Sequence, residues 1–420
     1  MAPAHQQFLL GVHALMKASK MSELRMAENE DSVKSEINLA DEIIAGRKCT
    51  NTKVQYGRKV EHFKKWISEV NPDCMSSDST LNLHLIDTSQ LQQFLGHICK
   101  KKNAKGEYLS PTVYQAFQHV SGYKSAIKDY YSTKNVKFSL ESGRMMEHFF
   151  KGYNRKIAQM KQDGFIPLIE GKQPISFKGY KFLASKALDQ LVDYNISISC
   201  HLFLVLCWNL IARCVSVGSL MYDHVSWSLD ALVIVFPSHK SDKEGKNALP
   251  KHVFANASEP AICPILSFAI YLFTRGYDRE GSKASLFSGE AESRFSKWLH
   301  KLCADNKEVL MNQGIEISMI GTHSFRKGVA SYLSGTPGGP TSISIYLRAG
   351  WSLGPVLSRY IMEGEGSDQQ CGRAAAGLPV TEVAFANLPP HFVSGDSGLT
   401  SNEWEDILPG YSTFYPKSFR

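Results

Sequence analysis

The sequence lacks the features that mark several large classes of protein. Its longest strongly apolar run covers about ten residues, from Phe203 to Ala212, whereas a membrane-spanning helix needs about 20. The stretch FLLGVHALM near the N-terminus has neither a basic segment before it nor a small-residue cleavage site after it, which argues against a secretory signal. Internal repeats and low-complexity blocks are also missing. We therefore expect an intracellular globular protein that does not bind a membrane.

Nine cysteines are scattered along the sequence, and no two of them form a Cys-x-x-Cys pair. Zinc modules place their cysteines in such pairs, and a disulfide framework usually has an even number of them. We therefore expect free thiols in a reducing compartment, and we predict neither a bound metal nor another cofactor.

Excess positive charge is missing from most of the chain, although the formal net charge is +7. Residues 1–46 hold 4 Lys and Arg against 7 Asp and Glu, and residues 164–420 hold 23 against 23. Residues 47–163 hold 20 against 10, so this segment carries the whole excess. A basic domain beside a neutral one suggests a polyanionic partner, because cations that bind phosphates release counterions. A solvated Lys-rich helix face has the same composition, so charge alone leaves both interpretations open.

Helical periodicity begins at Thr50. Apolar residues from Val54 to Ile67 recur three and four positions apart, while the nearby Lys and Arg residues largely avoid that stripe. Three further helices are expected at Thr88–Lys100, Ser110–Tyr131 and Leu140–Gln162. The stretch PLIEGKQPISFKGY contains Pro and Gly and indicates a linker after this basic bundle.

The clear β pattern of the sequence is confined to one region. The strands HVSWS, ALVIVF and NALPKHVF are separated by a turn at Leu229-Asp230 and by the charged turn KSDKEGK. Helices are expected around them at Phe177–Leu191, Ser197–Arg213, Pro264–Gly276, Glu290–Asp305, His323–Leu333 and Pro355–Met362. The sequence therefore predicts a mainly α-helical fold with a small antiparallel β-sheet.

These patterns divide the chain into five segments. We expect a flexible N-terminal arm (1–46), a basic helical bundle (47–163), a linker (164–176), a domain that holds the sheet (177–370) and a C-terminal tail (371–420).

Six residues of the second half form a set by their order and context. They are Arg213, Lys240, His323, Arg326, Trp351 and Tyr360. The first is an Arg at the predicted end of a buried helix, and the second is a Lys in a β-hairpin. A His-x-x-Arg pair on one helix face, a Trp and a helical Tyr follow. Each residue alone is unremarkable.

Together the set resembles the catalytic domain of the tyrosine recombinases, the family of the phage integrases. The resemblance covers about residues 175–370 and is carried by LIARCVSVGSL, VIVFPSHKSDKEGKNALP, GTHSFRKGVASYL and AGWSLGPVLSRYI. Within the family, the chain looks most like the Crypton-type recombinases of eukaryotic mobile elements. The bundle at 47–163 resembles the SAM-like core-binding domain, which in this family closes round duplex DNA with the catalytic domain.

The resemblance implies cleavage and rejoining of DNA strands without a metal ion, as in the integration of a mobile element. Tyr360 would attack a phosphodiester and form a 3′-phosphotyrosyl bond, which conserves the energy for resealing. Arg213 and Arg326 would grip its non-bridging oxygens, because a guanidinium group binds two oxygens through a planar fork.

The resemblance assigns the proton transfers to other members of the set. Lys240 would protonate the departing 5′-oxygen, with Lys243 and Lys246 as second choices. His323 would exchange a proton with the tyrosine hydroxyl or bind the phosphate. Trp351 stands where many members of the family have His, and its indole N–H could donate a hydrogen bond to the phosphate.

The sequence departs from the family pattern at two places. Ser216 stands where the family usually has an acidic residue that supports the catalytic arginines, so that support must come from elsewhere. The Gly- and Pro-rich insert GTPGGPTS lies between Arg326 and Trp351, and we expect a lengthened loop there.

The implied partner is double-stranded DNA, bound by a homotetramer on two sites that exchanges a segment after Tyr360. In a eukaryote the protein would act in the nucleus. Ten basic residues are the candidate DNA contacts of the bundle: Lys53, Arg58, Lys59, Lys64, Lys65, Lys100, Lys101, Lys102, Lys124 and Lys128.

Two other functions remain open. A type IB topoisomerase uses a similar set to relax supercoiled DNA as a monomer, although the basic bundle and the lack of a long linker before the tyrosine favour a recombinase. The second alternative is a DNA-binding protein that kept the fold and lost catalysis. Ser216 favours that alternative, and the six filled positions argue against it.

Overall fold

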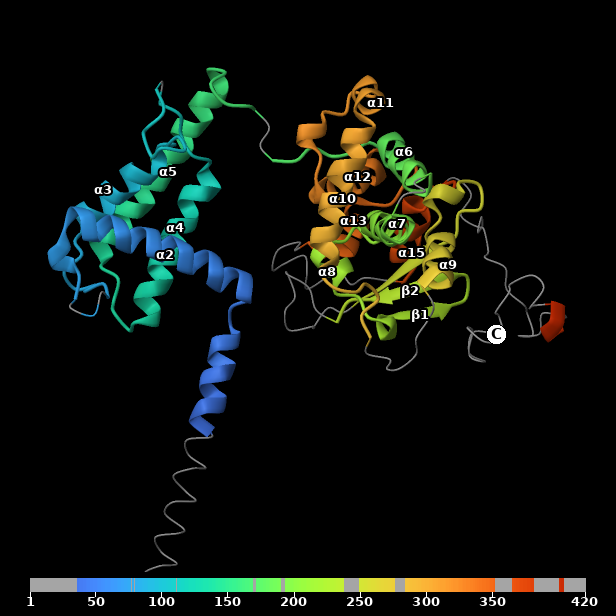
Figure 1. The fold of residues 1–420 in the computed structure, drawn as a ribbon, viewed down its shortest axis with the longest axis horizontal. Coiled ribbons are helices and arrows are strands. Elements are labelled where there is room, and N and C mark those ends of the chain that lie inside the picture. Colours follow the sequence, from blue (N-terminus) through green and yellow to red (C-terminus); the bar gives the residue numbers. More distant parts are fainter. Residues whose placement is uncertain are drawn as a thin grey trace, which may run out of the picture. The chain divides into compact units, whose positions relative to one another are not determined.

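The chain forms two compact units, Met1–Ile169 and Glu170–Arg420, called here the N-terminal and the C-terminal unit (Figure 1). The computed structural model describes residues 36–420 except 77, 79, 111, 169–170, 190–192, 238–248, 276–283, 352–364, 381–399 and 404–420. The division between the units falls within the expected linker at 164–176. Each unit has a hydrophobic core of its own.

The N-terminal unit is a bundle of helices (Figure 1). It contains α2 (Thr50–Val70), η1 (Pro72–Cys74), α3 (Thr88–Cys99), α4 (Phe117–Thr133) and α5 (Leu140–Gln162), after a helical stretch at 36–46. Helix α3 begins with a capping box, in which Asp87 accepts from the backbone of Gln90 (2.7 Å) and the Gln90 side chain accepts from the backbone of Asp87 (2.9 Å). The core is built from aromatic and aliphatic side chains of all four main helices.

Helix α4 begins at Phe117, so the start expected at Ser110 is wrong. The residues before it pair with the segment that follows α3, where Lys101 donates to the carbonyl of Val113 and Gln115 to that of Cys99, both at 2.8 Å. Backbone groups that are used in this pairing cannot enter the first turn of a helix.

The C-terminal unit combines helices with one small sheet (Figure 1). Its helices are α6 (Phe177–Leu188), α7 (Tyr194–Asn209), α8 (Cys214–Gly218), α9 (Pro264–Arg275), α10 (Ala291–Asp305), α11 (Lys307–Asn312), α12 (Thr322–Gly335), α13 (Ser342–Ala349) and α15 (Glu365–Ala375). Short 3-10 turns are η2 (Tyr222–His224), η3 (Pro260–Ile262) and η4 (Ile317–Met319). The strands are β1 (Val225–Ser228), β2 (Ala231–Val235) and β3 (Pro250–Phe254).

Helix α7 runs through the centre of this unit (Figure 1). All of its residues from Ser197 to Asn209 are buried. A helix that is covered on every side needs no polar face, which is why this sequence is apolar all round. Helices α6, α9, α10 and α12 pack against it.

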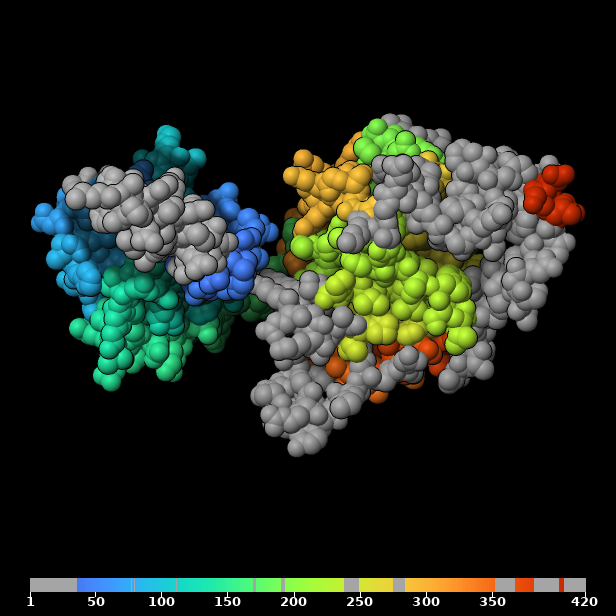
Figure 2. All heavy atoms as spheres, turned by 90° about the horizontal axis from the view of Figure 1, so that it is seen from below, coloured from blue at the N-terminus to red at the C-terminus, as the bar shows by residue number. Residues whose placement is uncertain are grey.

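The three strands form an antiparallel sheet in the order β1-β2-β3. Val233 lies opposite Ser226 of β1, and Ile234 lies opposite Lys251 of β3. Strand β2 is largely buried, whereas β1 is exposed and lies on the outer surface of the unit (yellow-green in Figure 2). The fold class predicted from the sequence, mainly α with a small antiparallel sheet, is confirmed.

Helix α15 crosses the tail boundary expected between residues 370 and 371, and the chain stays in the core beyond it. Cys371, Ala374 and Leu378 are buried. A Cβ atom on Gly372 would lie 2.2 Å from the carbonyl oxygen of His252, so only glycine allows α15 to approach β3 this closely. The small residues of CGRAAAGL give little hydrophobic periodicity, yet they are what permits this packing.

All nine cysteines are free thiols. Within the described residues, no helix combines the length and the apolar character that crossing a membrane requires. The same residues contain no group of three or more His, Cys, Asp and Glu side chains placed to hold a metal ion.

Candidate active site

The sequence predicted Arg213 at the end of a buried helix. In the structure Arg213 instead lies between α7 and α8. Helix α7 ends one turn earlier, and the N–H of Ile211 donates back to the carbonyl of Trp208 (3.1 Å). Ile211 has a φ of 49°, which is uncommon for a β-branched residue. The chain then becomes extended, and Arg213 is the N-cap residue of the short helix α8.

His323 and Arg326 lie in the first half of α12, as predicted. The His323 side chain is exposed and that of Arg326 is buried, with 7% of its surface accessible. Gly328 sets the position of this helix, because a Cβ atom there would lie 2.2 Å from the carbonyl oxygen of Ile175.

The Arg326 guanidinium is held by residues at the end of α13. Its Nη2 donates to the carbonyl of Ala349, and its Cζ lies 5.4 Å from the ring centroid of Trp351. Gly350 ends α13 in the left-handed conformation (φ 64°), after which the N–H of Trp351 donates to the carbonyl of Tyr346 (2.9 Å). The structure therefore brings the predicted Trp351 against the predicted Arg326.

The two predicted arginines act on each other electrostatically. Burial lowers the pKa of Arg326 to about 10, and the charge of Arg213 contributes to the same shift. Burial also lowers the pKa of Arg213. The Arg213 guanidinium, at the N-cap of α8, thus lies close enough to Arg326 of α12 for their charges to interact.

Lys251 of β3 connects the backbone segments that carry these arginines. Its Nζ donates to the carbonyl of Leu210 (3.2 Å), in the turn before Arg213. The same Nζ donates to the carbonyl of Arg348, which precedes the residue that holds Arg326. Lys251 therefore fixes the end of α7 relative to the end of α13.

Arg348 is a fully buried charge beneath this site. Its Nη2 donates to the carbonyls of Asn209 (2.9 Å) and His252 (2.8 Å), and its Nη1 donates to a carboxylate oxygen of Asp368. The other Asp368 oxygen lies 2.7 Å from the backbone nitrogen of His252 and 2.9 Å from its Nδ1.

Asp368 stays ionised at this buried position. Burial alone would raise its pKa, but the charge of Arg348 and the hydrogen bonds from His252 outweigh burial and lower the pKa to about 2. Arg348 and Asp368, together with their hydrogen bonds to His252, join α13, α15 and β3. The sequence pattern did not connect these three elements.

Four of the predicted residues, Lys240, Lys243, Lys246 and Tyr360, lie outside the described residues. Ser216 is half-buried in α8, one turn after Arg213, and its carbonyl accepts from the hydroxyl of Ser219 (3.0 Å).

The ten predicted DNA contacts lie on or between α2, α3 and α4. Lys59 and Lys102 converge on a group of histidines that is described below. Lys124 and Lys128 instead lie over aromatic rings, with their Nζ atoms 5.5 and 5.6 Å from the ring centroids of Phe150 and Phe138. Lys64 pairs with the carboxylate of Glu61 at 3.7 Å. Lys53, Arg58, Lys65, Lys100 and Lys101 are exposed.

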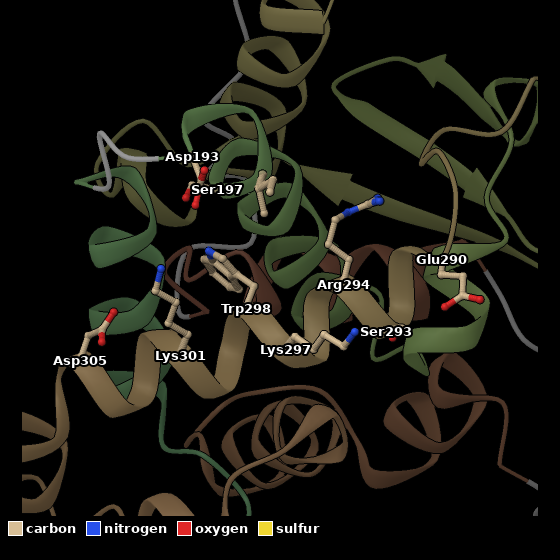
Figure 3. Close-up of a pocket in the computed structure, with 10 residues that line it drawn as sticks. Asp193, Ser197, Glu290, Ser293, Arg294, Lys297, Trp298, Lys301 and Asp305 are labelled. Carbon is tan, nitrogen blue, oxygen red and sulfur yellow. The ribbon is translucent and has the colours of Figure 1, made fainter.

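A basic face of α10 was missed by the sequence analysis. It borders a pocket of about 740 Å³ between α10 and the start of α7, where Arg294, Trp298 and Lys301 project from one side of α10 (Figure 3). Lys297 also lines a second hollow that reaches Thr322, next to His323. The helical spacing of the basic residues in SRFSKWLHKL is the signal that could have revealed this face.

Comparisons with known proteins found similar solved structures but no similar sequence. No protein-family profile matches it, and no curated protein matches its sequence. The XerH site-specific recombinase bound to difH substrate in a pre-cleavage complex is 12% identical with a TM-score of 0.43, over 74% of this chain and 75% of that chain. The Tn1549 transposon integrase in complex with transposon right end DNA is 11% identical with a TM-score of 0.46, over 79% and 95%.

A third similar structure is the FLP recombinase in a Holliday junction complex, 10% identical with a TM-score of 0.39, over 89% of this chain and 96% of that chain. Identities this low and TM-scores below 0.5 do not establish a function. The function proposed below therefore depends on the residues of this chain.

Proposed function

We propose that the protein cleaves and rejoins DNA strands by the chemistry of the tyrosine recombinases. The observation that carries this proposal is the convergence of Arg213 and Arg326 from separate helices, with Trp351 against one of them. A phosphodiester is the anion that two planar forks would bind best.

In the proposed reaction, the Tyr360 hydroxyl oxygen bonds to phosphorus while the bond from phosphorus to the 5′-oxygen breaks. The product is a 3′-phosphotyrosine and a free 5′-hydroxyl, and the reverse step reseals a strand without another energy source. Lys240 supplies the proton for the 5′-oxygen, with Lys243 or Lys246 as substitutes. His323 receives the proton of the tyrosine, a role that its exposed position at the start of α12 supports.

The two units divide the work in this proposal. The N-terminal unit, residues 47–163, serves as the core-binding domain and holds the duplex through its excess of positive charge. The catalytic domain begins at residue 177 and continues to residue 378, because α15 and the residues after it pack into its core. The basic face of α10, beside the start of α12, is an additional DNA contact.

The biological setting is also part of the proposal. We infer integration or excision of a mobile element of the Crypton type, in the nucleus of a eukaryotic cell, by a homotetramer on two DNA sites. The segment exchanged between protomers follows Tyr360.

The test is the capture of a covalent intermediate. Nicked suicide duplexes are drawn from the DNA that flanks the coding sequence, so that a short fragment leaves after cleavage and prevents resealing. We expect the wild-type protein to form a protein–DNA adduct and Tyr360→Phe to form none. Tyr346→Phe is the matched control, because it removes a tyrosine hydroxyl near Trp351 and keeps the ring, and it should form the adduct normally.

The alternatives give different results in the same experiment. A wild-type protein that binds the duplexes but forms no adduct on any of them would contradict the enzyme proposal and favour the DNA-binding protein without catalysis. Relaxation of a supercoiled plasmid without a cognate site, by the monomer, would favour the topoisomerase.

A further inference from the structure

Histidines and lysines gather on one surface of the N-terminal unit. We call this surface the histidine patch. It comprises His62, Lys59 and Lys65 of α2, His97 of α3, His119 and Tyr123 of α4, and Lys102 and Tyr108 of the segment between α3 and α4.

The three imidazoles are linked through shared aromatic partners. His62 Nδ1 lies 2.8 Å from the Tyr123 hydroxyl oxygen, and the ring centroids of His62 and His97 are 6.1 Å apart. His97 Nδ1 lies 3.0 Å from the Tyr108 hydroxyl oxygen. The rings of His119 and Tyr123 meet edge to face at 5.6 Å. The patch is therefore one continuous surface built by four segments.

Two lysines lie within this group of rings. Lys59 Nζ donates to the carbonyl of His119 (3.1 Å) and lies 4.0 Å from the ring centroid of Tyr123. Lys102 Nζ lies 3.4 Å from His97 Nε2 and 5.0 Å from the ring centroid of Tyr108. The charges of both ammonium groups act on His62.

The surroundings of the three imidazoles oppose their protonation. Burial lowers the pKa of each of the three imidazoles. The charge of Lys102 lowers the pKa of His62 and His97 further, and the charge of Lys59 does the same for His62 and His119.

Two other charges act on the patch. Lys65 adds to the lowering of the pKa of His62, whereas the carboxylate of Glu69 raises the pKa of His62 and His97. Burial and the positive neighbours together outweigh this carboxylate, because the net shift of the pKa of His62 and of His97 is downward. The patch therefore holds three imidazoles whose protonated form is disfavoured in the free protein.

We propose that the histidine patch binds backbone phosphates of duplex DNA and takes up protons when it does so. The proposal rests on the proposed function, which supplies DNA as the partner. A phosphate brings further negative charge to these groups, and it accepts hydrogen bonds from imidazolium and ammonium groups. His62 and His119 are exposed, so a ligand reaches them from solvent.

The direction of the pH effect follows from this arrangement. In the free protein the imidazoles are neutral near pH 7, since their pKa values are lowered from 6.5. Bound phosphate raises these pKa values, so the complex holds more protons than the free protein. DNA affinity must then increase as the pH falls from about 8 to about 6.

The experiment measures DNA affinity against pH with the full chain. A fluorescein-labelled duplex of about 30 base pairs is titrated at pH 6, 7 and 8 at constant ionic strength. The variant His62→Gln/His97→Gln/His119→Gln keeps polar side chains that do not protonate. His148→Gln is the matched control, because His148 is exposed on α5 of the same unit and outside the patch.

We expect the wild-type Kd to fall about tenfold from pH 8 to pH 6, and His148→Gln to behave the same way. In the triple variant this dependence should shrink to less than about twofold. Calorimetry at pH 7 in two buffers of different ionisation enthalpy should show proton uptake on binding by the wild type and less by the triple variant.

A triple variant that keeps the wild-type pH dependence would overturn the proposal. If the triple variant does not fold, as judged by its thermal melt, His62→Gln and His119→Gln are compared singly, and each must reduce the dependence. If the wild-type protein binds DNA with an affinity that does not depend on pH, the proposal for the histidine patch is also overturned, while the proposed function stays intact. A wild-type protein that binds no duplex at any pH overturns both.

Discussion

The Arg326 guanidinium group interacts with three residues at once. One nitrogen donates to the carbonyl of Ala349, while the group lies over the Trp351 ring and close enough to Arg213 for their charges to interact. In the proposed reaction the remaining N–H groups bind the phosphate. A single ammonium group does not reproduce this planar arrangement.

Replacement of this residue should therefore separate cleavage from binding. We expect Arg326→Lys to slow adduct formation by at least about 100-fold, because the lost donors act on the transition state. The Kd for duplex DNA should change less than about threefold, since the charge is kept. Single-turnover rates and anisotropy titrations measure the two effects, with Lys327→Arg as the exposed neighbouring control. A cleavage rate within tenfold of the wild type would contradict the assignment.

Some site residues could be predicted from the sequence and others could not. The His-x-x-Arg spacing places His323 and Arg326 on one helix because spacing is a local property. Lys251, Arg348 and Asp368 come from three elements and are single charged residues without a periodic pattern. Their burial is visible only when the fold brings their elements together.

At the scale of elements, the Arg348–Asp368 pair holds α13 and α15 against β3. The pKa of Asp368 is lowered to about 2 from 3.8, so its carboxylate contributes stability above about pH 4. That contribution is lost as the pH falls from about 4 to about 2, and it amounts to about 2 kcal/mol. Without the Asp368 carboxylate, Arg348 would be a buried charge with no opposite charge beside it.

Asp368→Asn should therefore lower the free energy of unfolding at pH 7 by about 3 kcal/mol, and the difference from wild type should shrink by about 2 kcal/mol between pH 4 and pH 2. Urea unfolding at pH 7, 4 and 2 measures this. The control is Asp230→Asn, which removes the less buried pair with Arg373 (2.7 Å) and should cost under about 1 kcal/mol. A difference that is constant with pH would show that Asp368 is not the titrating group.

Most elements were predictable, and their ends were less so. The helices expected at Thr88–Lys100, Leu140–Gln162 and Glu290–Asp305 match α3, α5 and α10 closely, because each shows a local apolar stripe. The end of α7 and the start of α4 differ, because nonlocal or turn hydrogen bonds take the backbone groups there. Helix α15 was not predicted, because its small residues form no apolar stripe.

For the whole molecule, the charge distribution predicts separate losses of binding and cleavage. Charge reversal at Lys53, Arg58 and Lys65 should weaken DNA binding at least about tenfold and reduce the slope of log Kd against log salt by about one for each lost phosphate contact. Arg213→Ala should abolish cleavage and retain most of the affinity. Lys307→Glu, exposed on α11 of the other unit, is the control for a single charge reversal and should leave the affinity nearly unchanged.

Both sets of variants are measured by anisotropy over a salt series and by adduct formation on nicked duplexes. If charge reversal in the N-terminal unit and Arg213→Ala weakened binding equally, the division of work between the units would be wrong.

One measurement decides most directly whether Tyr360 is the nucleophile. Wild-type protein is incubated with a pool of nicked duplexes of random sequence, the covalent adducts are isolated and digested, and the peptide that carries the nucleotide is sequenced by mass spectrometry. We predict a nucleotide joined to Tyr360 through its 3′-phosphate. A nucleotide on another residue, or a 5′-linkage, would contradict the proposed chemistry.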